Sequence, residues 1–444
     1  MINLRHARPK ASGLALALAL NFSPARGENL TETYDLALQN DPTLRQSEAT
    51  RDSVLESIPQ SVARLLPNIS VSAQMSKNYF NTGTTFIPGQ QGFQNFWTSS
   101  ATLQVTQPIY HHDYWVQLGQ ADNQVARAEA QYAAEHQNLI VRMARAYFDV
   151  LFAEDSLEFA HAERVAIERQ LEQAKARFDE GLIAITDVHE AQAGFDLANA
   201  NEIRAENELD NAREALREII GQQERPLSHL APEIPLSTPQ PANLDDWNRR
   251  AQESNFDIIA AQNTADLAKK AIDLQFAGHL PTLDLVGQAG FSDTNRINGI
   301  RYDNEVVGMQ VNVPLFAGGS VNSKVRQAEH ELSAAKDALD RQRRSVTRLT
   351  KDAYRSVLSS ISQVKALKAA VTSAQSALEA TEAGFEVGTR TMVDVLAEQR
   401  NLYRAQRDYA KARYDYIVSS LVLKQSASSL RREDVELVNT WLKR

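Results

Sequence analysis

The chain has 444 residues, of which 23% are charged and 43% are hydrophobic, and its formal net charge at pH 7 is −9. This balance excludes an intrinsically disordered chain, and no stretch is apolar over the roughly eighteen residues that a membrane-spanning helix needs. Because the chain has no cysteine, it has neither disulfides nor thiolate metal ligands. An acidic chain is also a poor ligand for nucleic acid, so we expect no nucleic-acid partner.

The first 27 residues have the pattern of a secretory signal peptide. Basic residues precede an apolar run over residues 11–20, and small residues stand at Ala25 and Gly27. We therefore predict that residues 1–27 are removed on export and that the mature chain begins at Glu28.

The exported part of the chain is a tandem duplication. Residues 37–69 align without a gap onto residues 251–283, at an offset of 214, and later matches keep an offset of 206 or 207. These matches predict four segments after the signal peptide: a first repeat over 28–221, a Pro-rich linker over 222–241, a second repeat over 242–431, and a C-terminal segment over 432–444.

Each repeat reads as a helix, two strands, a very long helix, a tight turn and a shorter returning helix. The long helices are predicted over 115–180 and 321–387, and the returning helices over 187–220 and 393–428. A helix of about 66 residues would be roughly 100 Å long. Apolar residues recur every three or four positions and alanine is frequent, which favours closely packed coiled coils. An ordinary solvated coiled coil has the same pattern.

The predicted strands alternate apolar and polar side chains, as the strands of an outer-membrane barrel do. A soluble β-sandwich shows the same alternation, so the pattern alone leaves both open. Four strands cannot close a barrel, since the smallest have about eight, and a membrane barrel would therefore need several chains. Three chains would supply twelve strands, although geometry alone does not exclude four. Prolines are expected to precede the first strand of each pair and to end the second: Pro67 and Pro281, then Pro108 and Pro314.

The two turns between long helices share one pattern. Residues 178–188 and 385–395 both read Phe-x-x-Gly-x-x-x-x-x-Asp-Val. Glycine ends a helix at little cost, because it adopts a left-handed backbone without a Cβ clash. An acid in the first turn of the next helix complements the helix dipole. Asp394, three residues after Thr391, also fits a capping box, so this acid has a purely structural interpretation as well.

Other motifs carry little chemistry. The segment His111-His112-Asp113 resembles a metal-ligand cluster, but no second cluster supports it, and we expect no metal or other cofactor. The chain shows no phosphate-binding loop, nucleophile elbow or zinc motif, so we predict that it is not an enzyme.

The exported chain resembles the TolC family of outer-membrane efflux and type I secretion channels. The resemblance is carried by four segments of distinctive sequence: residues 178–188, 278–284, 371–378 and 388–396. It implies an α+β fold in which a homotrimer builds a twelve-stranded transmembrane β-barrel, four strands per chain, continuous with a long periplasmic α-helical barrel of coiled coils. It also places the linker and the C-terminal segment in an equatorial region around the helices.

The resemblance implies a passive exit duct in the outer membrane of a Gram-negative bacterium, extending into the periplasm and contacting outer-membrane lipid. It would serve drug efflux, type I protein secretion or both. Its helix tips would untwist and open when a periplasmic adaptor and an inner-membrane pump of the RND or ABC type engage. The alternative is a non-conducting periplasmic coiled-coil scaffold, which the polar faces of the paired strands argue against, because a scaffold needs no lumen.

Residue roles follow from the same resemblance. Asp394 is expected to form an acidic constriction ring, whereas the position of a second ring is Ala397, followed by Glu398. We therefore expect one ring rather than two and a weaker block by divalent cations. The adaptor is expected to contact the two tips, which contain Gly181, Leu182, Gly388 and Thr389.

The closed entrance is expected to be held by links between neighbouring coils. By the family pattern, Arg390 binds Thr186 and Asp187, and Gln170 binds Glu382. A guanidinium suits this role because it directs two donors toward one carboxylate. Phe385 stands where the family usually has tyrosine, so it has no hydroxyl to donate to Asp187.

Overall fold

The structure is a computed structural model, and it describes residues 27–83, 92–222, 225–295 and 299–443. The predicted signal peptide lies outside the described residues except for Gly27, and its removal stays a prediction.

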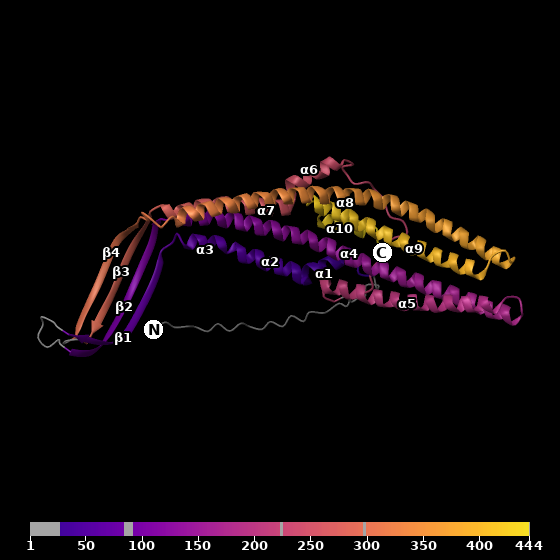
Figure 1. Cartoon of the computed structure of the whole chain (residues 1–444), viewed down its shortest axis with the longest axis horizontal. Coiled ribbons are helices and arrows are strands. Elements are labelled where there is room, and N and C mark those ends of the chain that lie inside the picture. Colours follow the sequence, from indigo (N-terminus) through magenta and orange to yellow (C-terminus); the bar gives the residue numbers. More distant parts are fainter. Residues whose placement is uncertain (1–26, 84–91, 223–224, 296–298, 444) are drawn as a thin grey trace, which may run out of the picture.

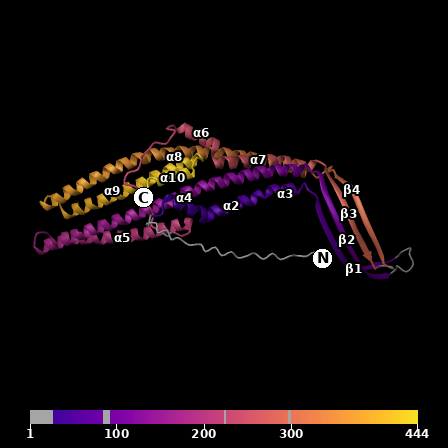
Figure 2. The same ribbon diagram turned by 180° about the vertical axis from the view of Figure 1, so that it is seen from behind.

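The molecule is elongated, with a β-sheet at one end and the turns between long helices at the other (Figures 1 and 2). Two sets of elements follow each other along the chain. The first set is α1 (Leu30–Asn40), α2 (Pro42–Leu55), α3 (Ser57–Ala63), β1 (Asn68–Thr82), β2 (Gly92–Tyr110), α4 (His112–Asp179) and α5 (Ile185–Ile220). The second set is α6 (Leu244–Ser254), α7 (Phe256–Phe276), η1 (Ala277–His279), β3 (Thr282–Thr294), β4 (Ile300–Asn312), α8 (Ser320–Glu386), α9 (Met392–Ser426) and α10 (Arg432–Asn439).

The long helices confirm the periodicity argument. Helix α4 has 68 residues and α8 has 67, whereas the returning helices α5 and α9 have 36 and 35. Helix α4 packs along α5, and α8 packs along α9, which gives two helical hairpins. Helix α4 also contacts α7 and α9, so the two hairpins are joined within one chain. In the described part of the chain, no helix combines the length and apolar character needed to cross a membrane.

The four strands form one antiparallel sheet in the order β1-β2-β3-β4. Its register places Ile69 opposite Val105, Val105 opposite Gly287, and Gly287 opposite Val307, so apolar residues of all four strands share a face. This confirms the predicted alternation. The expectation that Pro108 ends its strand is wrong: β2 continues to Tyr110 across an irregularity in its pairing with β3. Such a bulge accommodates proline, which has no N–H to donate to the ladder.

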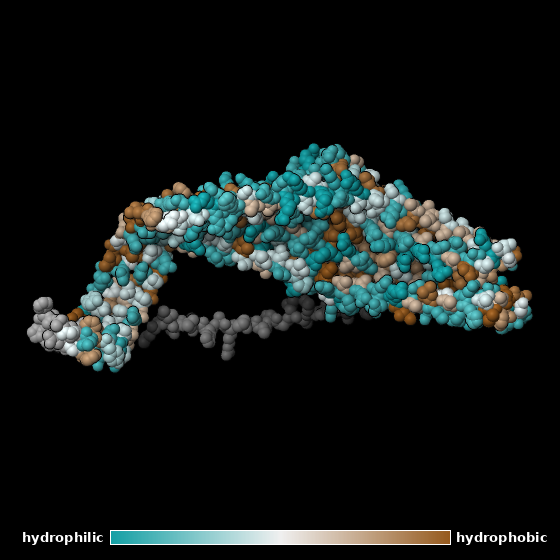
Figure 3. Space-filling view, viewed as in Figure 1, coloured by the Kyte–Doolittle hydropathy of each residue, from teal (hydrophilic) through white to brown (hydrophobic). Residues whose placement is uncertain are grey.

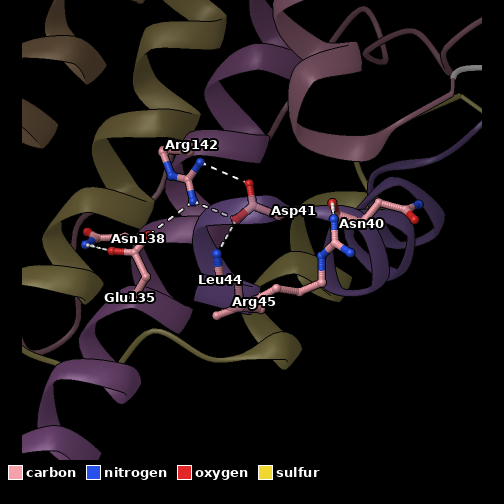
Figure 4. Close-up of polar contacts among 7 residues, drawn as sticks. All are labelled: Asn40, Asp41, Leu44, Arg45, Glu135, Asn138 and Arg142. Atoms are coloured by element: carbon pink, nitrogen blue, oxygen red, sulfur yellow. Dashed lines mark hydrogen bonds and ion pairs between the residues drawn. The ribbon is translucent and has the colours of Figure 1, made fainter. Parts of the chain in front are cut away.

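Each repeat breaks its first helix at the same point. Asp41, between α1 and α2, and Asn255, between α6 and α7, are both N-caps and lie 214 residues apart. The Asp41 carboxylate accepts from the Leu44 N–H at 2.6 Å and from two nitrogens of Arg142 at 3.1 Å each (Figure 4). The side chain of Asp41 is only 2% exposed. This ion pair fixes the break between α1 and α2 against α4.

The main core lies where the short helices and the linker pack around α4, α8 and α9. At its centre the Tyr147 hydroxyl shares its single proton between the Ser228 carbonyl, at 2.9 Å, and the Glu28 carbonyl, at 3.1 Å. Burial raises the pKa of Tyr147, so it stays a donor. These bonds attach the segment before α1 and the linker to the middle of α4.

Candidate gate at the helix tips

The turn between α4 and α5 has the hydrogen bonds of a Schellman motif. The N–H of Leu182 donates to the Arg177 carbonyl at 2.9 Å, and the N–H of Gly181 donates to the Phe178 carbonyl at 2.8 Å. Gly181 has a φ of 71°, a left-handed conformation that a residue with a Cβ rarely adopts. The glycine therefore ends α4 where the sequence predicts.

The turn between α8 and α9 repeats this motif 207 residues later. The N–H of Thr389 donates to the Gly384 carbonyl at 2.8 Å, and that of Gly388 donates to the Phe385 carbonyl at 3.1 Å. Gly388 has a φ of 76°. The backbone groups at both helix ends are thus satisfied locally, and each turn exposes its glycine and the following residue.

The two tips differ in chemistry. Leu182 is 73% exposed, which leaves an apolar side chain at the end of the α4–α5 hairpin. At the equivalent position Thr389 turns its hydroxyl back to the Gly384 carbonyl, at 3.0 Å. Figure 3 shows apolar side chains gathered at this end of the molecule, where Val387 is also 75% exposed. The exposed end of the α4–α5 hairpin is therefore apolar, and that of the α8–α9 hairpin is partly polar.

Gly384 leaves room for the side chain of Arg390 to pack against its backbone, a role that the sequence did not reveal. The N–H of Arg390 donates to the Gly384 carbonyl at 3.2 Å. A Cβ added at Gly384 would lie 2.8 Å from the Cγ of Arg390, closer than such contacts occur in proteins. The only available signal was a departure from the repeat, because the equivalent position in the first repeat is Arg177.

Asp394 forms a capping box at the start of α9. Its Oδ2 accepts from both the N–H and the hydroxyl of Thr391, at 2.9 Å each, and its own N–H donates to the Thr391 hydroxyl at 3.3 Å. These bonds, followed by the nearby Arg390, lower the pKa of Asp394, so the carboxylate is ionised. Helix α5 has no such cap, because Ala184 stands at its N-cap.

The predicted gate links do not close within one chain. Thr186 and Asp187 lie in the first turn of α5, and Arg390 lies in the turn before α9. Among the described residues of this single chain, Arg390 forms no hydrogen bond or ion pair with either of them, and Gln170 forms none with Glu382. The side chains of Thr186 and Arg390 are exposed.

Phe385 packs between apolar groups instead of forming a polar link. We call the tip cluster the buried apolar residues that join α4 and α5 to the start of α9: Ile167, Leu171, Ala174, Ala191, Ala198, Met392 and Leu396. Phe385 packs against this cluster and also against buried residues shared by α8 and α9. The guanidinium of Arg177 lies 5.0 Å from the centre of its ring. Phe385 is therefore held by apolar and cation–π contacts within the chain.

His111 serves the junction between sheet and helix. Its Nε2 lies 3.0 Å from the Asp284 carboxylate on β3, and its ring stacks on Tyr114 at 4.4 Å. In the described ranges, no group of three or more His, Cys, Asp or Glu side chains is arranged to hold a metal ion.

The sequence pattern of the family described as "Outer membrane efflux protein" matches residues 33–222 and 247–428. The chain belongs to this family. It is 40% identical over 435 residues to the outer membrane protein TolC of Vibrio cholerae, covering 97% of both chains. It is 37% identical to TolC of Escherichia coli, covering 97% of this chain and 88% of that one. The crystal structure of the CmeC outer membrane channel of Campylobacter jejuni has the same fold, with a TM-score of 0.78 at 16% identity, covering 99% of this chain and 98% of that chain.

Membership of this family establishes the function in outline. The chain is an outer-membrane exit duct of a Gram-negative bacterium, of the kind used in efflux and type I secretion, and it is not an enzyme. The scaffold alternative loses its support, because the family of outer membrane efflux proteins matches residues 33–222 and 247–428, most of the chain.

Proposed function

We propose that three copies of the chain assemble into one duct, with a twelve-stranded β-barrel in the outer membrane and a helical barrel in the periplasm. The observation that carries this proposal is the open sheet. Strands β1 and β4 each have an edge without a partner strand among the described residues, and four strands are too few to close a barrel. Unpaired edges are not tolerated in lipid, so the strands of neighbouring chains must pair.

The apolar face of the sheet supports a position in lipid. Val71, Met75 and Val307 are 73%, 70% and 80% exposed in the single chain. Polar residues alternate with them and would line a water-filled interior. The helices then extend into the periplasm, and a position of the hairpin tips far from the membrane is supported by their location at the end of the molecule opposite the sheet (Figure 1).

The closed entrance is held, on this proposal, by links between hairpins of neighbouring chains. Arg390 binds Thr186 and Asp187, and Gln170 binds Glu382. Among the described residues, Arg390 forms no hydrogen bond or ion pair with a carboxylate, although Asp394 is near, and this supports such an assignment because its exposed guanidinium can bind a neighbour. Each link at the surface contributes about 0–1 kcal/mol, so several together hold a gate that partners can still open.

Asp394 lines the constriction as a single acidic ring of three carboxylates. Its capping role is compatible with this, because the bonds from Thr391 keep the carboxylate ionised. A periplasmic adaptor docks at the tips around Gly181, Leu182, Gly388 and Thr389, and an inner-membrane pump of the RND or ABC type supplies the energy. The exposed Leu182 supports an apolar contact with the adaptor.

Single-channel conductance in planar bilayers tests these assignments. Arg390→Ser should raise the resting conductance, whereas Arg344→Ser should not, since Arg344 is an exposed arginine of α8 whose ion pair is with Asp340 on the same helix. Asp394→Asn keeps an oxygen for Thr391 but removes the charge, and it should weaken block by divalent cations on the periplasmic side. Wild-type currents from both Arg390→Ser and Asp394→Asn would refute the gate and the ring.

A further inference from the structure

A groove opens between α5 and α9, with α4 as its floor, directly beyond the tip cluster. Its volume is about 680 Å³, which lies within the range of roughly 300–1,000 Å³ typical of small-molecule sites. We call it the basic groove. Residues from Leu197 to Glu208 of α5 and from Ala397 to Lys411 of α9 form its walls.

The groove is basic in a chain that is acidic. Three acidic side chains line it, against five basic ones, although the whole chain has a net charge of −9. The basic side chains are Arg204, Arg400, Arg404, Arg407 and Lys411. A concave surface of one sign concentrates ligands of the opposite sign, so the groove favours anions.

Three polar side chains in the groove are poorly satisfied, those of Arg404, Arg407 and Ser156, whereas the Nε–H of Arg400 donates to the Leu396 carbonyl at 3.2 Å. Among the described residues, Arg404 forms no hydrogen bond or ion pair, and Arg407 reaches a carboxylate only at 3.9 Å, on Asp408. Ser156, on the floor, is 8% exposed, and its hydroxyl has no hydrogen-bond partner in the described structure. A buried hydroxyl without a partner is costly, and an acceptor bound in the groove would satisfy it.

The groove also has an apolar part. Phe152, Phe159 and Tyr403 line it beside the charged residues, and the Lys411 ammonium lies 5.3 Å from the centre of the Phe152 ring. Aromatic side chains next to guanidinium groups suit a ligand that has a flat apolar body and anionic substituents. A fully hydrated inorganic anion would leave these rings without a contact.

The groove faces away from the linker. Arg413 donates to the Ala231 carbonyl, and the Tyr416 hydroxyl accepts from the Ser237 N–H at 3.0 Å, so the linker covers that side of α9. Arg404 precedes Arg413 by nine residues, which is about two and a half turns of helix and therefore the opposite face.

We propose that the basic groove binds small amphipathic anions, carrying sulfonate or carboxylate groups on an aromatic body, as they pass through the duct. The proposal rests on the proposed function, because it assigns the face opposite the linker to the interior of the channel. Arg404 and Arg400 bind the anionic groups, and the Ser156 hydroxyl donates to one of them.

The test uses 1,3,6,8-pyrenetetrasulfonate, a water-soluble fluorescent anion, and the purified full-length protein in its assembled state. Fluorescence anisotropy should show saturable binding. Arg404→Gln should weaken it about tenfold, and Arg404→Lys, which keeps the charge, less than threefold. Glu163→Gln removes an acid from the groove and should tighten binding.

Arg213→Gln is the matched control, because Arg213 pairs with Glu154 outside the groove. The affinity of this variant for the pyrene anion should equal that of the wild type. No saturable binding, or equal loss in Arg404→Gln and Arg213→Gln, would overturn the proposal. Conductance of the same preparations separates the two hypotheses. A protein that conducts without binding the anion refutes the groove alone, whereas one that binds the anion but does not conduct, even with Arg390→Ser, refutes the proposed trimeric pore.

Discussion

The contact between Leu396 and Gly194 offers two opposite perturbations of the tip cluster. Leu396 of α9 is 5% exposed. A Cβ added at Gly194 of α5 would lie 3.5 Å from its Cδ1 and 3.6 Å from a methyl carbon of Ile167, which is ordinary van der Waals contact. Leu396→Ala therefore removes the side chain that packs between the hairpins, whereas Gly194→Ala adds a methyl group to the same contact.

The magnitudes follow from burial and from helix propensity. Large-to-small substitutions of leucine in a core cost about 2–5 kcal/mol, and the lower value applies here because the tip cluster is small and relaxes easily. Alanine is better than glycine in a helix by about 1 kcal/mol, and the added methyl group gains contact. We expect Leu396→Ala to destabilise the join between hairpins by about 2 kcal/mol and Gly194→Ala to stabilise it by about 1 kcal/mol.

Native-state hydrogen exchange of the amides around residues 188–200 and 392–402 measures the stability of this contact between the hairpins, because local opening controls exchange there. At about 1.4 kcal/mol per tenfold, Leu396→Ala should accelerate exchange roughly 30-fold and Gly194→Ala should slow it about fivefold. Leu437→Ala, a truncation of a 51% exposed leucine in α10, should change neither. If both tip substitutions changed exchange in the same direction, the assigned contact would be wrong.

Two further predictions concern buried carboxylates. Asp41→Ala should lower the free energy of unfolding by about 2–3 kcal/mol in denaturant titration, because it removes the α2 cap and leaves Arg142 without its buried partner, and an unchanged midpoint would contradict this. Burial raises the pKa of Asp155 in the folded protein, although the Tyr414 hydroxyl donates to its carboxylate at 2.7 Å. The contribution of Asp155 to the free energy of unfolding is therefore complete below the unfolded pKa, and it is lost as pH rises through the folded pKa. Asp155→Asn should therefore be more stable than the wild type at neutral pH and lose that advantage in acid, and an advantage independent of pH would count against this linkage.

Local rules explain why so much of the fold was predictable. The long helices follow from apolar spacing without interruption by proline, and their ends follow from Gly181 and Gly388, which supply the left-handed residue of each cap. The faces of the strands follow from a period of two, which the observed register preserves across the sheet.

Features that depend on distant contacts were not predictable. The tip cluster joins Ile167 to Met392, and no spacing within α9 indicates that its first turn packs on α4. Gly384 has a role only because the chain turns back and brings Arg390 against it. Pro108 shows the same limit in the sheet, because a bulge that depends on the neighbouring strand lets β2 continue past it.

The structure also bears on how the proposed gate would open. The two hairpin ends are each fixed by their own hydrogen bonds, whereas the tip cluster holds the hairpins of one chain together through apolar contact. Surface links cost about 0–1 kcal/mol each to break, but separating the hairpins exposes the buried side chains of Met392 and Leu396, at roughly 1.5–3 kcal/mol each. Opening that moves whole hairpin pairs would therefore need only the breaking of the proposed links between chains. Opening that separates the hairpins within a chain needs a partner that covers the exposed apolar surface, which an adaptor bound beside the tips could supply.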